Sequence, residues 1–221
     1  MFETDSPDYD IEVRFFTPTT EVPICGHATI AAHYVRAKER NMEGGTVIQK
    51  TKAGILPVEV VRTLSDYSIT MTQGTPAVSA PFGDTVRERI ADALGIAHEE
   101  ICREYPVAVA STGHSKVMVP LYSNELLHGL RPDLQKLTKI SKQIECNGYY
   151  VFTLNPQNKI LVHGRMFAPA IGIAEDPVTG NANGPLGAYL VHFNILQEED
   201  APCFDFDILQ GEAIKRDGTM H

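Results

Sequence analysis

The sequence predicts an α+β fold of two pseudo-symmetric lobes, each a curved, mainly antiparallel sheet wrapped around a central helix. Two observations predict this fold: a strand-to-helix motif that occurs twice, and runs of alternating apolar and polar residues near each copy. We expect an N-terminal lobe over residues 1–80 and a C-terminal lobe over residues 81–221.

The repeated motif is a strand, a Phe-x-Pro break, and a helix that begins at a glycine followed by small residues. The first copy leads from Arg14–Pro18 to a helix over residues 26–40. The second leads from Arg165–Pro169 to a helix over residues 180–193. Three of the five positions in Arg14–Pro18 are identical to those in Arg165–Pro169. The alternative to a true repeat is a chance match.

Other elements follow from local patterns. Strands are expected over residues 11–15, 46–49, 55–61, 67–71, 107–110, 116–121, 148–154, 160–167 and 203–209. Helices are expected over residues 86–94, capped by Asp84 or Thr85, and over residues 132–144. Residues 74–83 are a candidate linker, 98–101 an exposed acidic turn, and 198–200 an acidic loop. Residues 213–218 resemble a strand that enters a hairpin turn, with no return strand after it.

The two glycine-headed helix starts are candidate halves of a ligand site. The first backbone N–H groups of a helix lack intrahelical partners and lie at the positive end of its dipole, which favours a carboxylate or a developing enolate. The site would therefore suit removal of a proton next to a carboxylate. The candidate binding residues are Gly26, Ala28, Gly180, Asn181 and Ala182.

Composition excludes several classes of function. A net charge of −9 argues against a nucleic-acid or anionic-membrane partner. No apolar run approaches the ~20 residues that span a bilayer, and the acidic start is not a signal peptide, so we expect a cytoplasmic protein. The four cysteines and eight histidines lack metal-ligand spacing, so we expect no metal and free thiols.

The sequence resembles the PhzF-like (phenazine biosynthesis-like) isomerase family, which shares the diaminopimelate epimerase fold. The resemblance covers essentially the whole chain and is carried by four motifs: Phe16-Thr17-Pro18, Cys25-Gly26-His27-Ala28-Thr29, Thr112-Gly113-His114 and Asp176-Pro177-Val178-Thr179-Gly180-Asn181-Ala182. It implies a cofactor-independent proton shift on a small carboxylic acid bound between the lobes. The family's type case isomerises a dihydro-hydroxyanthranilate.

The resemblance also implies roles for individual residues. His27 and Asp176 correspond to catalytic residues of the family, whereas Asn181 stands where the type case has a serine. An amide can donate a hydrogen bond but cannot relay a proton as a hydroxyl does. The family's acid/base glutamate would fall upstream of Met1, so we expect a chain truncated at both ends, with first strands missing, and weakly active or inactive.

Three further residues have alternative interpretations. Cys25 stands where diaminopimelate epimerases carry a thiol base, so a Cys25-dependent amino-acid epimerase is one alternative, although Thr179 occupies the corresponding position in the second motif. His114 is either a cleft residue or part of a structural turn, and His33 is expected to pack in the core. A non-catalytic remnant or binding module is the second alternative, and a homodimer is a candidate assembly because exposed edge strands favour association.

Overall fold

Separate sheets organise the two units of the chain. The computed structural model describes residues 1–17, 19–146, 148–155, 160–196 and 206–220. Unit 1 comprises residues 1–75 with 112–114, and unit 2 comprises residues 76–111 with 115–221. Pro18 of the predicted break, the acidic loop 198–200, and residues 203–205 of a predicted strand lie outside the described residues.

Unit 1 contains a five-stranded sheet in the order β1-β2-β5-β6-β7 and a two-stranded hairpin, β3-β4. Its strands are β1 (Phe2–Glu3), β2 (Ile11–Glu12), β3 (Phe15–Phe16), β4 (Glu21–Val22), β5 (Gly45–Thr51), β6 (Gly54–Arg62) and β7 (Tyr67–Met71). All neighbours pair antiparallel except β2 and β5, which are parallel. The predicted alternation over residues 11–15 is confirmed, because Ile11, Val13 and Phe15 are buried, but the segment is divided between β2 and β3.

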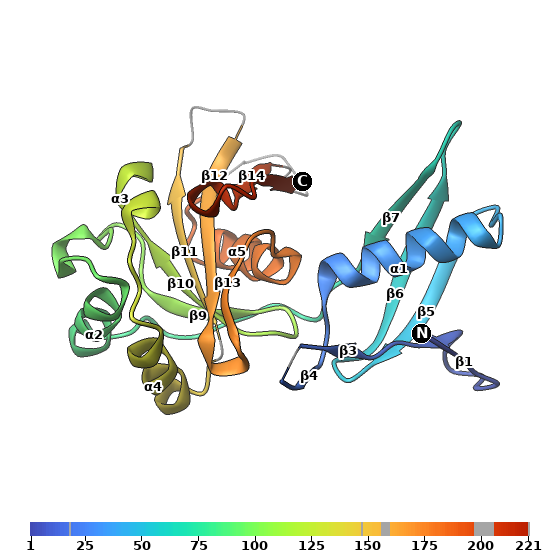
Figure 1. Cartoon of the computed structure of the whole chain (residues 1–221), viewed down its shortest axis with the longest axis horizontal. Coiled ribbons are helices and arrows are strands. Elements are labelled where there is room, and N and C mark those ends of the chain that lie inside the picture. Colours follow the sequence, from blue (N-terminus) through green and yellow to red (C-terminus); the bar gives the residue numbers. More distant parts are fainter. Residues whose placement is uncertain (18, 147, 156–159, 197–205, 221) are drawn as a thin grey trace. The chain divides into compact units, whose positions relative to one another are not determined.

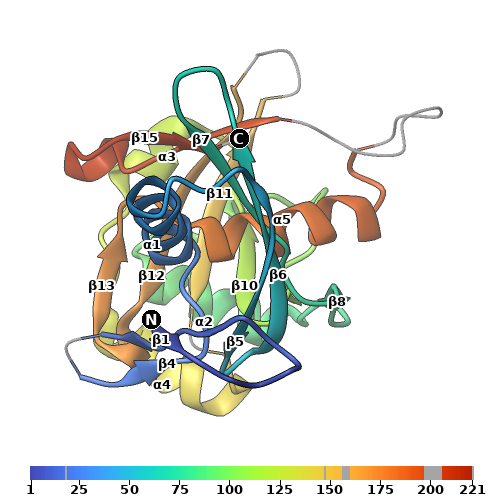
Figure 2. The ribbon, with the colours of Figure 1, turned by 90° about the vertical axis from the view of Figure 1, so that its right-hand side faces the viewer.

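Helix α1 (Gly26–Glu39) packs against β6 and β7 (Figure 2). Its buried residues include Thr29, His33 and Ala37, which recur at every fourth position and so form one face of the helix. Arg36 and Lys38 lie in the last turn, where positive charge complements the helix dipole. The helix predicted over residues 26–40 is therefore confirmed, as is the burial of His33 in the core.

Unit 2 is built on an eight-stranded sheet in the order β15-β14-β12-β11-β10-β9-β8, with β13 also paired to β12. Its strands are β8 (Ala77–Val78), β9 (Ala108–Ser111), β10 (Lys116–Pro120), β11 (Tyr149–Leu154), β12 (Ile160–Ala168), β13 (Ile173–Asp176), β14 (Asp207–Gln210) and β15 (Gly218–Met220). The pairs β10-β11 and β12-β14 are parallel, and the other pairs are antiparallel.

Helices cover both faces of this sheet (Figure 1). They are α2 (Asp84–Leu94), α3 (Asn124–Gly129), α4 (Leu134–Ile144) and α5 (Gly180–His192), with short 3-10 turns η1 (His98–Glu100), η2 (Pro169–Ile171) and η3 (Glu212–Ile214). Alternate residues of β11 separate the two cores: Tyr149 and Val151 pack with α2 and α4, whereas Tyr150 and Phe152 pack with α5. The predicted α+β class, with a mainly antiparallel sheet and a glycine-headed helix in each unit, is confirmed.

The strand predicted over residues 213–218 is wrong. Glu212–Ile214 form the 3-10 turn η3, flanked by Gly211 and Lys215 in the left-handed region at φ 83° and 56°. Positive φ values interrupt an extended strand. The hairpin is instead formed by β14 and β15, so a return strand after η3 is present in Gly218–Met220.

Three smaller expectations also change. Gly83, in extended conformation, is the N-cap of α2, so Asp84 lies inside the first turn and does not cap the helix. The candidate linker 74–83 contains β8, which pairs with β9. Helix α4 begins at Leu134 because the Asp133 side chain accepts hydrogen bonds from the N–H groups of Gln135 and Lys136.

Candidate active site

The first helix start is formed by Cys25–Ala28 in unit 1. Cys25 is the N-cap of α1 in extended conformation, at φ −142° and ψ 114°, and its side chain does not cap the helix. The Thr29 hydroxyl and N–H both donate to the Cys25 carbonyl, at 2.8 and 3.0 Å, which fixes the first turn. The exposed His27 ring lies beside the thiol, with Nε2 3.6 Å from Cys25 Sγ.

The second helix start follows β13 in unit 2. Asp176 ends β13, and Thr179 is the N-cap of α5 at φ −121° and ψ 92°. The Thr179 hydroxyl donates to Asp176 Oδ2 at 2.8 Å, so it orients the carboxylate. The Thr179 N–H donates to Gln210 Oε1 at 2.7 Å, which ties the start of α5 to the end of β14. Asn181 and Ala182 are buried in the first turn.

The two starts have the same local construction. In each, an extended N-cap residue without a side-chain cap precedes a glycine at the first helical position, Gly26 in α1 and Gly180 in α5. Cys25 therefore corresponds to Thr179, as the sequence alignment of the two motifs predicted. Helix starts of this kind present backbone N–H groups and positive potential, the features that bind anions.

His114 lies in the turn between β9 and β10 and is half-buried. Thr112, which precedes it in this turn, contacts residues 73 and 74 of unit 1. The Gly74 N–H donates to the Thr112 carbonyl at 2.8 Å, and the Thr112 hydroxyl forms a hydrogen bond with the Gln73 side chain. A Cβ at Gly74 would lie 3.0 Å from that carbonyl, so glycine permits the close approach. Residues 112–114 group with unit 1 for this reason.

Two residues near the second start were not found from the sequence. Gln210 is fully buried, 31 residues after its partner Thr179, and no local pattern indicates the contact. Lys116 is also buried, and burial lowers its pKa to about 8 even though charge on Cys146 and Asp176 acts in the opposite direction. A single lysine in the apolar run of β10 is the signal that could have indicated Lys116.

Two surface pockets and two of the free thiols lie away from the helix starts. Among the described residues, one pocket is lined by residues 62–65 and Glu43. A second is lined by residues of α4 with Pro169, Gly172 and Ala174. No residue of either helix start lines these two pockets.

Cys25, Cys102 and Cys146 are free thiols, as predicted, and Cys203 lies outside the described residues. No helix among the described residues is both long enough and apolar enough to cross a membrane.

Solved structures define the class of protein to which this fold belongs. A PhzF-family phenazine biosynthesis protein from Bacillus anthracis superposes with a TM-score of 0.77 and 30% identity, over 97% of this chain and 72% of that one. A hydroxyproline epimerase from Agrobacterium vitis, solved with bound trans-4-hydroxy-L-proline, has the same fold at a TM-score of 0.59 and 12% identity, over 94% of this chain and 60% of that one. The chain therefore has an epimerase-like fold.

Sequence comparison gives the family. A family model described as phenazine biosynthesis-like protein covers residues 1–221, and the chain belongs to this PhzF family. An uncharacterised isomerase of Clostridium acetobutylicum is 52% identical over 221 residues, which are all of this chain and 73% of that protein. The uncharacterised isomerase YddE of Escherichia coli is 49% identical over 219 residues, 99% of this chain and 73% of that protein. These relatives support an isomerase- or epimerase-like function.

Proposed function

We propose that the chain carries both helix starts of an isomerase that shifts a proton on a small carboxylic acid without a cofactor. In this proposal one carboxylate is bound between the lobes by backbone N–H groups of Gly26–Ala28 and Gly180–Ala182. His27 and Asp176 orient the substrate and relay protons near the reacting carbon.

The observation that carries the proposal is the equivalence of the two helix starts. Each has an extended N-cap residue whose own side chain makes no capping hydrogen bond, and each continues with glycine. Glycine at the first helical position lets a ligand approach the backbone closely, and the positive end of the helix dipole there favours a carboxylate.

The polar side chains at the starts support distinct roles. The Thr179 hydroxyl donates to Asp176, so this carboxylate is held in one orientation, as a proton relay requires. Asn181 is buried in the first turn of α5 and can donate to a ligand oxygen, but it cannot transfer a proton. We therefore assign Asn181 to binding and His27 and Asp176 to proton relay.

Titration followed by NMR tests the proposal directly. We expect 3-hydroxyanthranilate or trans-4-hydroxy-L-proline to shift the backbone amide signals of residues 26–28 and 180–182 together, with one dissociation constant. Asn181→Ala should weaken binding, whereas the control His192→Ala, at the exposed far end of α5, should not. Probes that shift neither set, or only one of the two, would contradict a ligand shared by both starts.

A second candidate function is favoured by the contact between Cys25 and His27. The 3.6 Å separation of Sγ and Nε2 is suited to a thiol that exchanges a proton with an imidazole. In an amino-acid epimerase of this type, Cys25→Ser or alkylation of Cys25 would abolish exchange of the substrate Cα proton with deuterated solvent. Undiminished exchange after either change would leave the first proposal as the better one.

A further inference from the structure

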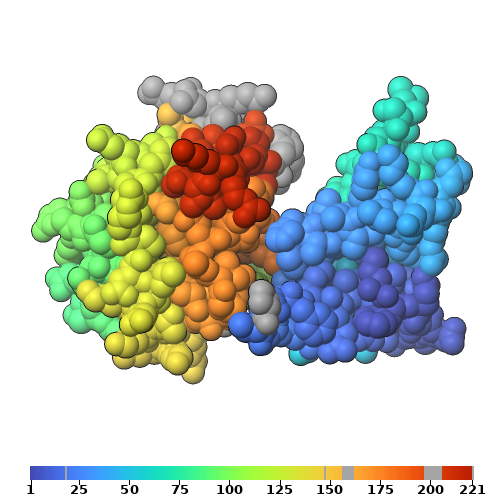
Figure 3. All heavy atoms as spheres, viewed as in Figure 1, coloured from blue at the N-terminus to red at the C-terminus, as the bar shows by residue number. Residues whose placement is uncertain are grey.

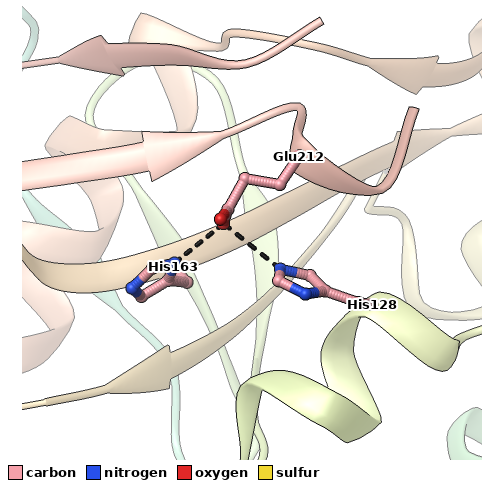
Figure 4. Close-up of side chains that lie close together, drawn as sticks. All are labelled: His128, His163 and Glu212. Atoms are coloured by element: carbon pink, nitrogen blue, oxygen red, sulfur yellow. Dashed lines mark hydrogen bonds and ion pairs between the residues drawn. The ribbon is translucent and has the colours of Figure 1, made fainter. Parts of the chain in front are cut away.

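Three side chains from separate elements of unit 2 meet at its surface (Figure 4). His128 lies on α3, His163 on β12, and Glu212 on η3. His163 Nδ1 lies 2.7 Å from Glu212 Oε2, and His128 Nε2 lies 3.2 Å from the same oxygen. Within the described ranges of the chain, this is the group of three His, Cys, Asp or Glu residues whose ligand atoms all lie within 4.8 Å of one another.

These separations are close to those between ligands on one metal ion. Zinc binds imidazole nitrogen and carboxylate oxygen at about 2.0–2.2 Å, so neighbouring ligand atoms in a tetrahedral site are about 3.3–3.6 Å apart. The two hydrogen-bonded separations, 2.7 and 3.2 Å, are slightly shorter than this, and all three ligand atoms lie within 4.8 Å of one another. Small side-chain rotations would suffice to place an ion among the three atoms.

The framework holds each side chain in place. His163 is on an internal strand and pairs with Thr153 of β11 and Leu209 of β14. Helix α3 is capped by the Ser123 side chain, which accepts from the Leu126 N–H. Glu212 follows Gly211, whose φ of 83° requires glycine, since a Cβ there would collide with the Arg216 carbonyl group.

The group is also accessible. The side chains of His128, Glu212 and His163 are 38%, 28% and 15% exposed, so an ion could enter from solvent without disrupting the core. In Figure 3 the C-terminal segment that carries Glu212 (red) lies on the surface of unit 2, next to the yellow-green α3 region.

We propose that His128, His163 and Glu212 bind a divalent transition-metal ion, with Zn²⁺ the best match. Two imidazoles and one carboxylate suit zinc and its first-row neighbours, whereas Mg²⁺ and Ca²⁺ prefer all-oxygen sites. Three protein ligands leave a fourth tetrahedral position for water or another small ligand. The site is independent of the proposed isomerase function.

Metal binding would have a structural consequence. The ion would join α3, β12 and η3, elements that are otherwise held here by the hydrogen bonds of Glu212 to the two rings. The β14-β15 turn that includes η3 approaches the Asp176–Gly180 segment, because a Cβ at Gly211 would lie 3.1 Å from the Pro177 carbonyl oxygen. The bound ion would therefore stiffen the turn beside the start of α5.

The alternative is a hydrogen-bonded His-Glu-His group that needs no metal. Calorimetric titration of the EDTA-treated full chain with Zn²⁺ separates the two. We expect one Zn²⁺ to bind per chain, with an affinity that falls more than about 100-fold in His128→Ala, His163→Ala and Glu212→Gln. Loss of a residue that only hydrogen-bonds to a metal ligand already costs about 10–100-fold. The exposed His192→Ala is the matched control and should retain this affinity.

Thermal unfolding gives an independent measurement and verifies folding of the variants. Zn²⁺ should raise the melting temperature of the wild-type chain and of His192→Ala, and leave that of Glu212→Gln unchanged. Glu212→Gln preserves the shape of the side chain, so its melting without metal reports whether it folds. Wild-type Zn²⁺ affinity in the three variants, or the absence of a bound equivalent in the wild-type chain, would overturn the proposal.

Discussion

Arg165 binds Glu175 through two parallel hydrogen bonds, Nε to Oε1 at 2.9 Å and Nη2 to Oε2 at 2.8 Å. The same guanidinium lies 5.0 Å from the centre of the Phe167 ring. In unit 1, Arg14 binds both oxygens of Glu21, at 2.8 and 3.1 Å, and lies 5.1 Å from the Phe16 ring. In each unit, therefore, the arginine of the repeated motif binds a glutamate and lies close to the ring of the motif's phenylalanine.

The arginines of the two pairs differ in burial, although the glutamates, 13% and 14% exposed, do not, and the pairs should differ in their contribution to stability. Arg165 and Glu175 are 7% and 13% exposed, and Arg165 also donates to the carbonyls of Leu127 and Leu130, whereas Arg14 is 46% exposed. We expect Glu175→Gln to lower the free energy of unfolding by about 3–5 kcal/mol, because it leaves a buried charge uncompensated. Glu21→Gln is the matched control and should have a much smaller effect in urea denaturation. Equal losses would show that burial does not distinguish the pairs.

Lys116 predicts a rise in stability at alkaline pH. Its pKa is about 8 in the folded chain, against an ordinary value of 10.5, so between these values the unfolded state binds more protons. The free energy of unfolding should therefore increase from pH 8 to 10.5, by up to about 3 kcal/mol. Lys116→Met should abolish this increase, whereas Lys142→Met, at an exposed position with the same change of charge, should retain it. Parallel pH profiles for all three proteins would contradict the prediction.

His33 predicts a dependence of the same sign at mildly acidic pH, because its folded pKa is also lowered. Burial lowers its pKa below 6.5, against the effect of its 3.1 Å hydrogen bond with Gln49, so the folded ring stays neutral where the unfolded one is protonated. Stability should decrease as pH falls through 6.5 and stop decreasing once the folded ring is protonated. We expect His33→Gln to flatten the melting-temperature profile between pH 7 and 5. The exposed His192→Gln serves as control, and a flat wild-type profile would refute the assignment.

Gly164 provides space for Tyr150 on the neighbouring strand. A Cβ at Gly164 would lie 2.6 Å from Tyr150 Cζ and still closer to the hydroxyl oxygen, so Gly164→Ala should destabilise unit 2. In a Tyr150→Leu background the same change should cost less, with a coupling energy of roughly 0.5–3 kcal/mol in a double-mutant cycle. Additive losses would indicate that the ring is not what excludes a side chain from position 164.

The tyrosine itself carries a buried hydroxyl without a hydrogen-bond partner among the described residues. Burial raises its pKa, and the group remains a neutral phenol. We expect Tyr150→Phe to preserve or increase stability, because it removes an unsatisfied polar atom at nearly constant volume. Thermal denaturation measures this, and a loss of more than about 1 kcal/mol would indicate a partner for the hydroxyl.

The parts of the fold that the sequence predicted are those with regular periodicity. β5, β6 and β7 follow alternating residues, and α1 and α5 begin at their predicted glycines. Helix α3 was missed because its six residues give too short a periodic pattern. Strand β13 was missed because its four residues form a strand by pairing with β12, and the local sequence does not show that pairing. Residues 213–218 were misassigned because the left-handed conformation of Lys215 has no signal in its residue type.

The candidate sites also contain parts that the sequence predicted and parts that it did not. The two helix starts were predicted because their motifs are continuous in sequence. The contacts of Glu212 with His163 and His128 span 49 and 84 residues, and that of Gln210 with Thr179 spans 31, so spacing rules could not detect them. These contacts depend on the parallel pairing of β12 with β14, which brings distant segments together.

The hydrogen bond between Thr179 and Gln210 makes one amide proton a reporter on the C-terminal hairpin. Both residues are buried, so the Thr179 N–H can exchange with solvent only when the end of β14 separates from α5. Its exchange rate would measure how often the hairpin opens. Any ligand that slowed this exchange, whether at the helix start or at η3, would be stabilising the closed form.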